Sequence, residues 1–363
     1  MNLDDHARAS AQGLLGSVAR VDPVAGLDQL LRRRRRRLVS RAAMTLATAT
    51  IVAVVAWVGI RELQPPAIVT QPGSLGRVTA TIPVGADPSD VLVSQGAVWV
   101  AAGQSVSRID PATGTTTSMV VVGPRPRLAA GFGSIWAANN NPSGISLSRI
   151  DARTGQVEAT IPITVTTPAV KPTQLAVGAG AVWVIASNIS NYQLLRIDPA
   201  TNQAAALDTV GEFMGGGMAV AGGQVWLSGR DDQLISSLLR VNPATNQIAD
   251  PIPADGDAAL TVGGGSLWQA GIATQTIYRL DPKSGRKLAE IPIGVVPQQL
   301  TAGDGSVWVG SPSGRVTRID MATNTVTRTF QINGPAPAAA AGYGSVWITD
   351  TAKAALLRVQ PTG

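Results

Sequence analysis

The sequence predicts an all-β fold, a seven-bladed β-propeller of four-stranded blades, from three observations. First, seven tryptophans recur 37 to 47 residues apart. Second, each follows a glycine, a small or polar residue and an aliphatic residue, as in Gly96-Ala97-Val98-Trp99. Third, short segments rich in Val, Ile, Leu and Thr fill each period between turn signals, as strands do. A period of about 40 residues made of short strands is typical of one propeller blade. The tryptophans are Trp99, Trp136, Trp183, Trp226, Trp268, Trp308 and Trp347.

Each period contains four expected strands. In the third copy the innermost strand is expected at 174–177, the second at 182–185 and the third at 194–198. The outer strand is clearest one copy earlier, at 156–161. Asp110-Pro111-Ala112-Thr113-Gly114 joins the third strand to the outer one, because Asp accepts local N–H bonds, Pro presets φ and Gly adopts positive φ. Similar turns begin at Asp151, Asp198, Asn242, Asp281 and Asp320.

The two ends of the repeat region complement each other. The last copy stops after its third strand, at 356–359, and an outer-strand pattern stands at the other end, at 76–84. The sequence therefore predicts a ring closed by an N-terminal strand in the last blade, which removes the exposed sheet edges.

The first 75 residues differ from the repeats. Residues 1–41 form a basic tail with six consecutive arginines, Arg32 to Arg37, and residues 42–60 carry no charge. Nineteen helical residues span about 28 Å, close to the hydrocarbon core of a membrane, which predicts a transmembrane helix. The arginines orient it with the N-terminus in the cytoplasm and the propeller outside. A cleaved signal peptide is the alternative. Residues 61–75 are a proline-rich linker, and 76–363 form the propeller.

Composition limits the classes of function. The net charge is +6, but residues 1–63 contribute +5, from ten arginines and five acids. The near-neutral propeller has no electrostatic footprint for nucleic acid. The absence of cysteine excludes disulfides, thiol catalysis and a lipoprotein anchor. The excess of arginine over lysine, 25 to 4, indicates a bacterial genome rich in GC. We expect a monomer in a bacterial cell membrane, single-pass, whose partners are the membrane through 42–60 and an unknown protein or envelope ligand.

The repeat resembles the streptogramin-lyase-like (virginiamycin B lyase-like) and YVTN-type bacterial propellers. The resemblance is carried by copies of Ala-Val-Gly-x-Gly-Ala-Val-Trp-Val, as at 176–184, and of Arg-Ile-Asp-Pro-Ala-Thr-Gly, as at 108–114. It covers about residues 76–360 and implies the propeller fold. For the lyases it also implies histidine acid/base chemistry with a divalent metal. The one histidine, His6, precedes the propeller, so the catalytic histidines of the lyases have no counterpart here, and we do not carry their activity over.

Length variation indicates which face carries recognition. From each Trp to the Arg of the third strand the distance varies from 9 to 14 residues, and 164–172 holds extra residues before the third blade. Both variations map to one face, around blades two to four, where loops on a rigid scaffold usually bind ligands. For each Asn or Asp, a role as turn former is the alternative. The candidate ligand-binding residues are Arg127, Asn139, Asn140, Asn141, Lys171, Asn188, Tyr192, Phe213, Arg230 and Asp231.

A metal site would need oxygen ligands that converge on the central funnel. Asp90, Gln174 and Gln299, expected just before inner strands, are weak candidates for Mg²⁺ or Ca²⁺, and Asp255 and Asp257 precede the fifth blade. One carboxylate and two amides are a poor set for a hard cation, so we expect no metal and no cofactor.

We expect the first of three functions, and the other two are its alternatives. The first is a membrane-anchored extracytoplasmic scaffold that binds a ligand without catalysis, which predicts an open face with exposed Tyr192 and Phe213. The second is a divalent-metal-dependent lyase or lactonase-like enzyme, which predicts converging acids in the funnel. The third is transmembrane signalling through the cytoplasmic tail, which predicts that deleting residues 1–31 abolishes the phenotype of a folded, inserted protein.

Overall fold

The structure is a computed structural model, and it describes residues 77–141, 144–165, 171–188, 192–209, 214–230, 235–332 and 338–360. The basic tail, the expected transmembrane helix and the proline-rich linker lie outside these residues. Within the described ranges, no helix has the length and apolar character needed to cross a membrane.

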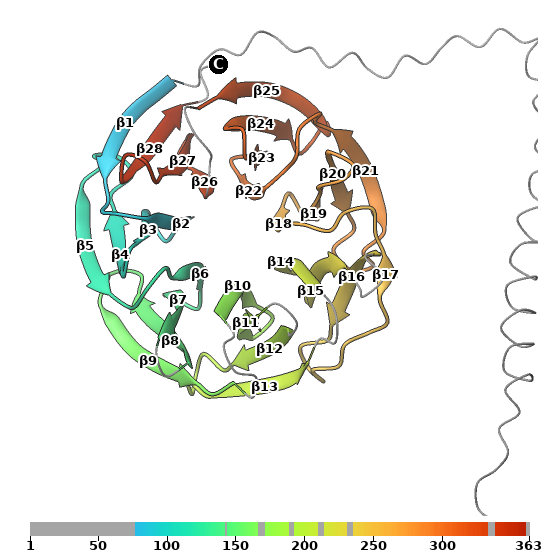
Figure 1. The fold of residues 1–363 in the computed structure, drawn as a ribbon, viewed down its shortest axis with the longest axis horizontal. Coiled ribbons are helices and arrows are strands. Elements are labelled where there is room, and N and C mark those ends of the chain that lie inside the picture. Colours follow the sequence, from blue (N-terminus) through green and yellow to red (C-terminus); the bar gives the residue numbers. More distant parts are fainter. Residues whose placement is uncertain are drawn as a thin grey trace, which may run out of the picture. The chain divides into compact units, whose positions relative to one another are not determined.

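The described residues form seven antiparallel sheets of four strands each. Figure 1 shows them arranged as a ring, with one strand of each sheet near the centre and one at the rim. The prediction of a seven-bladed propeller with four-stranded blades is confirmed.

The blades are named here in ring order, blade 1 being the sheet that begins with β2. The inner strands are β2 (Pro88–Ser94), β6 (Arg127–Gly131), β10 (Lys171–Gly178), β14 (Met214–Ala221), β18 (Leu260–Gly263), β22 (Gln299–Gly303) and β26 (Ala339–Gly342). The second strands are β3 (Ala97–Ala102), β7 (Ser134–Asn141), β11 (Ala181–Ser187), β15 (Gln224–Arg230), β19 (Ser266–Gly271), β23 (Ser306–Gly310) and β27 (Ser345–Asp350). The third strands are β4 (Ser105–Ile109), β8 (Gly144–Asp151), β12 (Tyr192–Ile197), β16 (Ser236–Val241), β20 (Thr276–Leu280), β24 (Arg315–Asp320) and β28 (Ala355–Gln360).

The outer strands are β5 (Thr116–Val121), β9 (Val157–Ile163), β13 (Ala204–Thr209), β17 (Ile252–Pro253), β21 (Lys287–Pro292), β25 (Thr325–Gln331) and β1 (Arg77–Pro83). The last of these shares a sheet with strands from the other end of the chain, in the order β1-β28-β27-β26. β17 has only two residues. Pro251 and Pro253 account for its shortness, because proline cannot donate to a strand ladder.

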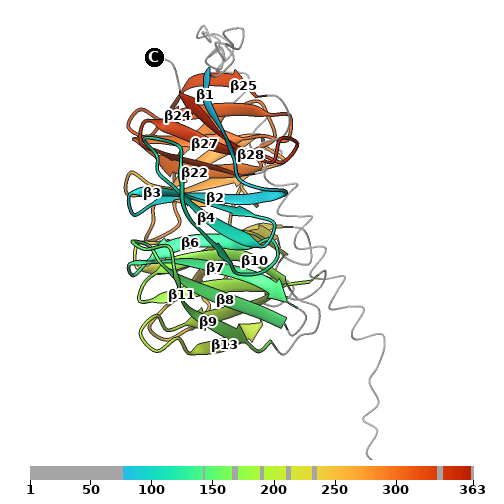
Figure 2. The same cartoon turned by 90° about the vertical axis from the view of Figure 1, so that its left-hand side faces the viewer.

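Antiparallel pairing divides the connections between two faces. The hairpins from first to second strand and the turns from third to outer strand emerge on one side, which we call the hairpin face. The connections from second to third strand and from outer strand to the next blade emerge on the other, the loop face. Figure 2 shows the ring from its rim, with the strands running between these faces.

The tryptophans pack between neighbouring blades, as their sevenfold recurrence predicts. Trp136 of blade 2 belongs to one core cluster with Val182 and Val184 of blade 3. Its indole N–H donates to the carbonyl oxygen of Gly131 in its own hairpin (3.1 Å). The second strands that carry the tryptophans are buried along nearly their whole length, so each is a core element on both sides.

Arginines on three of the third strands, Arg149, Arg240 and Arg279, donate to a backbone carbonyl of the next blade and so cross-link the ring. The guanidinium of Arg149 lies 5.2 Å from the centre of the Trp136 ring, where a cation is attracted to the ring face. Its Nε donates to Ser134 Oγ (2.9 Å) and its Nη1 to the carbonyl of Pro199 in the next blade (2.7 Å). Arg279 repeats the arrangement with Ser266 and the carbonyl of Met321. The repeated Arg is therefore a joint of the ring, which leaves recognition to residues that do not repeat.

Candidate functional site

The candidate residues of blade 3 lie in one row at the loop face. Lys171 is registered opposite Ser187, and Ser187 opposite Tyr192. Lys171 is exposed, while Tyr192 and the neighbouring Asn188 are half-buried. A cation and an aromatic ring with a hydroxyl thus stand at the same end of one blade, which is a combination suited to binding an acidic group beside an apolar one.

Arg230 ends β15 at the same face of blade 4, in a row with Met214 and Ser236. Its Nε donates to Oδ2 of Asp257 (2.5 Å), and its Nη2 contacts the same oxygen. Oδ1 of Asp257 accepts the N–H of Ile272 (3.2 Å). The sequence grouped Arg230 with Asp231, which lies outside the described residues, as does Phe213. In the structure, Arg230 instead pairs with Asp257, which lies in the segment leading to blade 5.

The prediction that residues 139–141 lie in a loop is wrong. β7 continues to Asn141, and β8 begins at Gly144, so these residues extend a strand. Asn139 is buried; its Nδ2 donates to the carbonyl of Val122 (2.8 Å), and its Oδ1 accepts from Ser146 Oγ (2.9 Å). This side chain ties blade 2 to the segment that follows blade 1. Asn140 is half-buried opposite Ile145, and the side chain of Asn141 is outside the described set.

The funnel candidates Asp90 and Gln174 also differ from expectation, because β2 and β10 begin earlier than predicted. Each of these strands contains a register shift just before the candidate residue, so Asp90 and Gln174 lie within strands rather than before them. Arg127 and Gln299 are the first residues of their inner strands, β6 and β22, whereas Gln299 was expected just before its strand.

Asp90 and Gln174 occupy matching places in blades 1 and 3, and both reach the next blade. The Asp90 carboxylate accepts the N–H groups of Val91 and of Leu128 in blade 2 (both 2.9 Å). Burial raises the pKa of Asp90, and Arg127 and the two N–H bonds partly oppose that shift. Gln174 Nε2 donates to the carbonyl of Gly216 in blade 4 (3.3 Å). Both polar groups therefore serve as links between blades.

Metal ligands do not gather elsewhere in the part of the chain that the structure describes. It contains no group of three or more His, Cys, Asp or Glu side chains placed to hold an ion. Asp255, the other acid considered for the funnel, pairs with Lys287 Nζ (2.7 Å), which also contacts Glu290 (3.0 Å). Lys287 lies 5.4 Å from the centre of the Tyr278 ring, and hydrogen bonds to Asp255 and then Glu290 raise its pKa. A recess of about 140 Å³ beside the short strand β17 is lined by Asp255, Tyr278 and Lys287 of this cluster.

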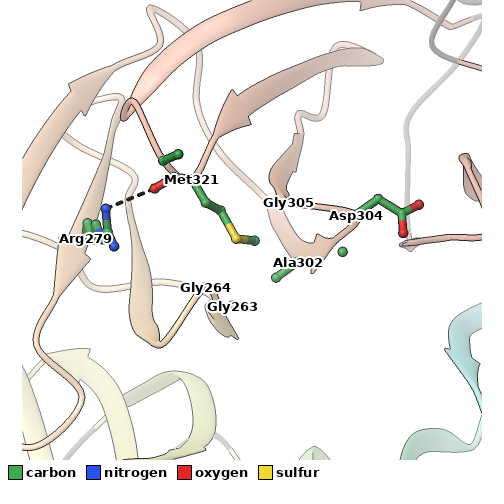
Figure 3. Close-up of a pocket in the computed structure, with 9 residues that line it drawn as sticks. Gly263, Gly264, Arg279, Ala302, Asp304, Gly305 and Met321 are labelled. Atoms are coloured by element: carbon green, nitrogen blue, oxygen red, sulfur yellow. Dashed lines mark hydrogen bonds between the residues drawn. The ribbon is translucent and has the colours of Figure 1, made fainter.

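The sequence did not predict the larger recess, of about 540 Å³, on the hairpin face between blades 5 and 6. Figure 3 shows Met321 extending between the Gly263–Gly264 hairpin and Ala302, with Arg279 bonded to its carbonyl oxygen and Asp304 directed away. Asp304 instead accepts the N–H of Gly344 from blade 7 (3.0 Å). One feature of the sequence could have indicated this recess. Met321 stands at the turn position where four other turns have proline, namely Pro111, Pro199, Pro243 and Pro282.

The chain is a seven-bladed β-propeller. No protein-family model and no curated protein sequence matches it. Among solved structures, 1385 chains match, so the fold is too widespread to select a function. One is a hydrazine synthase of Kuenenia stuttgartiensis, with a TM-score of 0.62 and 12% identity over 76% of this chain and 96% of that one. Another is the computationally designed Ika8 protein, with a TM-score of 0.55 and 11% identity over 78% of this chain and all of that one. At such identities the likeness shows the fold alone.

Proposed function

We propose that this protein is a membrane-anchored, extracytoplasmic propeller whose loop face binds a protein or cell-envelope ligand without catalysing a reaction. The observation that carries the proposal is the juxtaposition of Lys171 and Tyr192 at the loop end of blade 3, with Arg230 at the corresponding end of blade 4. Tyrosine and arginine contribute disproportionately to binding energy at protein interfaces. The exposed Lys171 favours a ligand that carries an acidic group, and Arg230, whose charge Asp257 already balances, can add hydrogen-bond donors.

The absence of catalysis is supported by how the funnel polar groups are used. A general acid or base must reach a reacting proton, and a metal needs several converging oxygens. The side chains of Asp90 and Gln174 instead form hydrogen bonds with the backbone of the next blade. The repeat motifs support a relationship to the streptogramin-lyase-like and YVTN-type propellers. Among these propellers, we place this chain with those that bind a ligand without catalysis.

The anchor and its orientation rest on the sequence of residues 32–60. Six arginines followed by nineteen uncharged residues support a single-pass helix with a cytoplasmic N-terminus, in a bacterial membrane. We also infer that β1 closes the ring, because it is the outer strand of a sheet whose other strands come from the end of the chain.

The binding role is tested by photo-crosslinking in cells that express the full chain. A photoreactive amino acid replaces Tyr192, and a matched control carries it at Met119, a 64% exposed residue of the outer strand β5. We expect an adduct of defined mass at position 192 and none at 119, and the adduct should be lost when Lys171→Ala or Arg230→Ala is added. An adduct that is indifferent to both substitutions would contradict a site at this row.

The metal-dependent alternative is tested on the same purified chain by a thermal-shift titration with Ca²⁺ and Mg²⁺. A ligand that binds only the folded state must raise its melting temperature. We expect no shift. A stabilisation that is abolished by Asp90→Ala would overturn the non-catalytic proposal in favour of an enzyme with its site in the funnel.

A further inference from the structure

We propose that the hairpin face of the propeller docks on the surface of the lipid bilayer, through aromatic residues at the hairpin tips of blades 2 and 7. This proposal rests on the proposed membrane anchor. It goes beyond that anchor by assigning the membrane-contacting surface of the folded domain and the residues that make it.

The first argument is the place where the chain enters the propeller. Val346, next to the hairpin of blade 7, is registered with Val359, and Val359 is registered with Val78. Arg77, at the start of β1, therefore lies at the hairpin end of the blade. The linker expected at 61–75 spans at most about 50 Å when fully extended. A tether that joins the domain on this face favours the hairpin face as the side toward the membrane.

The second argument is the chemistry of two hairpin tips. Phe132 and Tyr343 are 46% and 43% exposed, and both adopt a positive φ of 55°. Each is followed by a glycine of positive φ, which gives a turn where Asn-Gly is the preferred pair. A bulky residue is unfavourable in this conformation and gains nothing from burial here. Exposed aromatic rings at such positions fit the headgroup level of a membrane, where Trp and Tyr concentrate.

The third argument is charge. Six of the seven hairpin tips carry no charge, and the exception, Asp304, accepts a hydrogen bond from the blade 7 hairpin. The aspartates of the neighbouring turns accept N–H bonds within their own turns, as Asp110 does from Thr113 and Ala112, and these bonds lower the pKa of the carboxyl groups and keep them ionised. Exposed cations on the same face offset these charges, so the uncharged tips rather than a net positive charge favour contact with the bilayer; the cations are Arg77, Arg153, Lys283 and Arg286.

The test uses the full chain, which has no natural cysteine. Single-cysteine variants Phe132→Cys and Tyr343→Cys carry an environment-sensitive fluorophore, and Ile272→Cys, on a loop-face connection and 43% exposed, is the matched control. Each is reconstituted in vesicles of phosphatidylcholine and phosphatidylglycerol, with and without spin-labelled lipid. We expect quenching at 132 and 343 to exceed that at 272 by about twofold or more, since aromatic belts lie at headgroup depth.

An alkaline carbonate wash separates the two proposals. If the chain stays in the vesicles but all three labels are quenched equally weakly, docking is overturned and the anchor stands. If the chain is washed out, the anchor fails, and docking then survives only if labels 132 and 343 still respond to added vesicles. A label response in detergent that grows with protein concentration would assign the face to a second copy of the chain and overturn docking.

A second variant keeps the test independent of folding defects. Phe132→Asn with Tyr343→Asn places at both tips a residue that tolerates positive φ. With the reporter moved to Gln95→Cys, at the blade 1 tip between them, we expect unchanged or higher thermal stability together with loss of lipid quenching. A purely structural role for the aromatic residues predicts the reverse, a lower melting temperature with quenching retained, and would contradict the proposal.

Discussion

At the scale of single residues, one atom decides whether the arginine joint of a blade is complete. Where a serine precedes the aliphatic-Trp pair, its hydroxyl accepts from the arginine Nε, as Ser345 does from Arg358 (2.9 Å). Blades 1 and 3 have Ala97 and Ala181 at that position. In the described structure, Nε of Arg108 and Nε of Arg196 are buried without a hydrogen-bond partner. In blades 1 and 3 the arginine Nε therefore lacks the acceptor that a serine hydroxyl supplies in the serine-containing blades.

Ala97→Ser and Ala181→Ser should each stabilise the protein by about 0.5–1.5 kcal/mol, the usual net contribution of one hydrogen bond. Serine adds a single oxygen and faces the unsatisfied Nε. The measurement is the free energy of unfolding from denaturant titration. Ser134→Ala is the matched control and should lose a similar amount. Destabilisation by both Ala→Ser changes would show that the hydroxyl cannot reach the guanidinium.

At the scale of elements, the turns from third to outer strand use proline only where its missing N–H is not needed. In two copies the second turn residue is Ala152 or Met321, and its N–H donates to the hairpin of its own blade. The acceptors are the carbonyls of Gly133 (3.2 Å) and Gly305 (3.1 Å). A non-proline residue at this position thus joins turn and hairpin into one unit.

Ala152→Pro should therefore destabilise the protein by about 0.5–1.5 kcal/mol, although proline stands there in four other turns, because the hydrogen bond to the Gly133 carbonyl is lost. The denaturation midpoint measures the effect. As a control, Pro111→Ala should cost less than about 1 kcal/mol, mostly through the freedom of the unfolded chain. A neutral or stabilising Ala152→Pro would rule out any contribution of the bond to Gly133.

At the scale of the whole molecule, β1 pairs with a strand some 280 residues away in sequence, and Thr79 contacts the carbonyl of Arg358. Ile82 of β1 is buried in a core cluster that includes Trp347 of blade 7 and Val98 of blade 1. If β1 closes the ring, loss of this side chain loosens two blades at once.

Ile82→Ala should cost about 2–5 kcal/mol, the range for deleting a buried isoleucine side chain. Val78→Ala, on the same strand but 45% exposed, should change stability by less than about 0.5 kcal/mol. Thermal unfolding of the two variants side by side gives the comparison. Equal effects would mean that β1 is not a closing element.

The parts of the fold that repeat could be predicted from sequence, because each such position is sampled six or seven times. Trp136 and the turn at Asp110 belong to this class. The candidate site could be predicted only in part. Asn139 resembles a turn former, yet both flanking strands extend past the expected loop, and it becomes a buried link. The partners of Asp90 and Arg230 lie 38 and 27 residues away in other blades, at positions that do not repeat, so no local pattern indicates them.

The pairing of β1 with β28 has a mechanical consequence. β1 runs from the hairpin face toward the loop face, and six residue pairs register it with β28. Tension applied at Arg77 and resisted by a ligand on the loop face would pull β1 along its own axis. Hydrogen bonds loaded in this way share the force and must break together, rather than one after another as in peeling. The strand that completes the last blade would thereby serve as a shear-resistant attachment point between the propeller and whatever holds its N-terminal side.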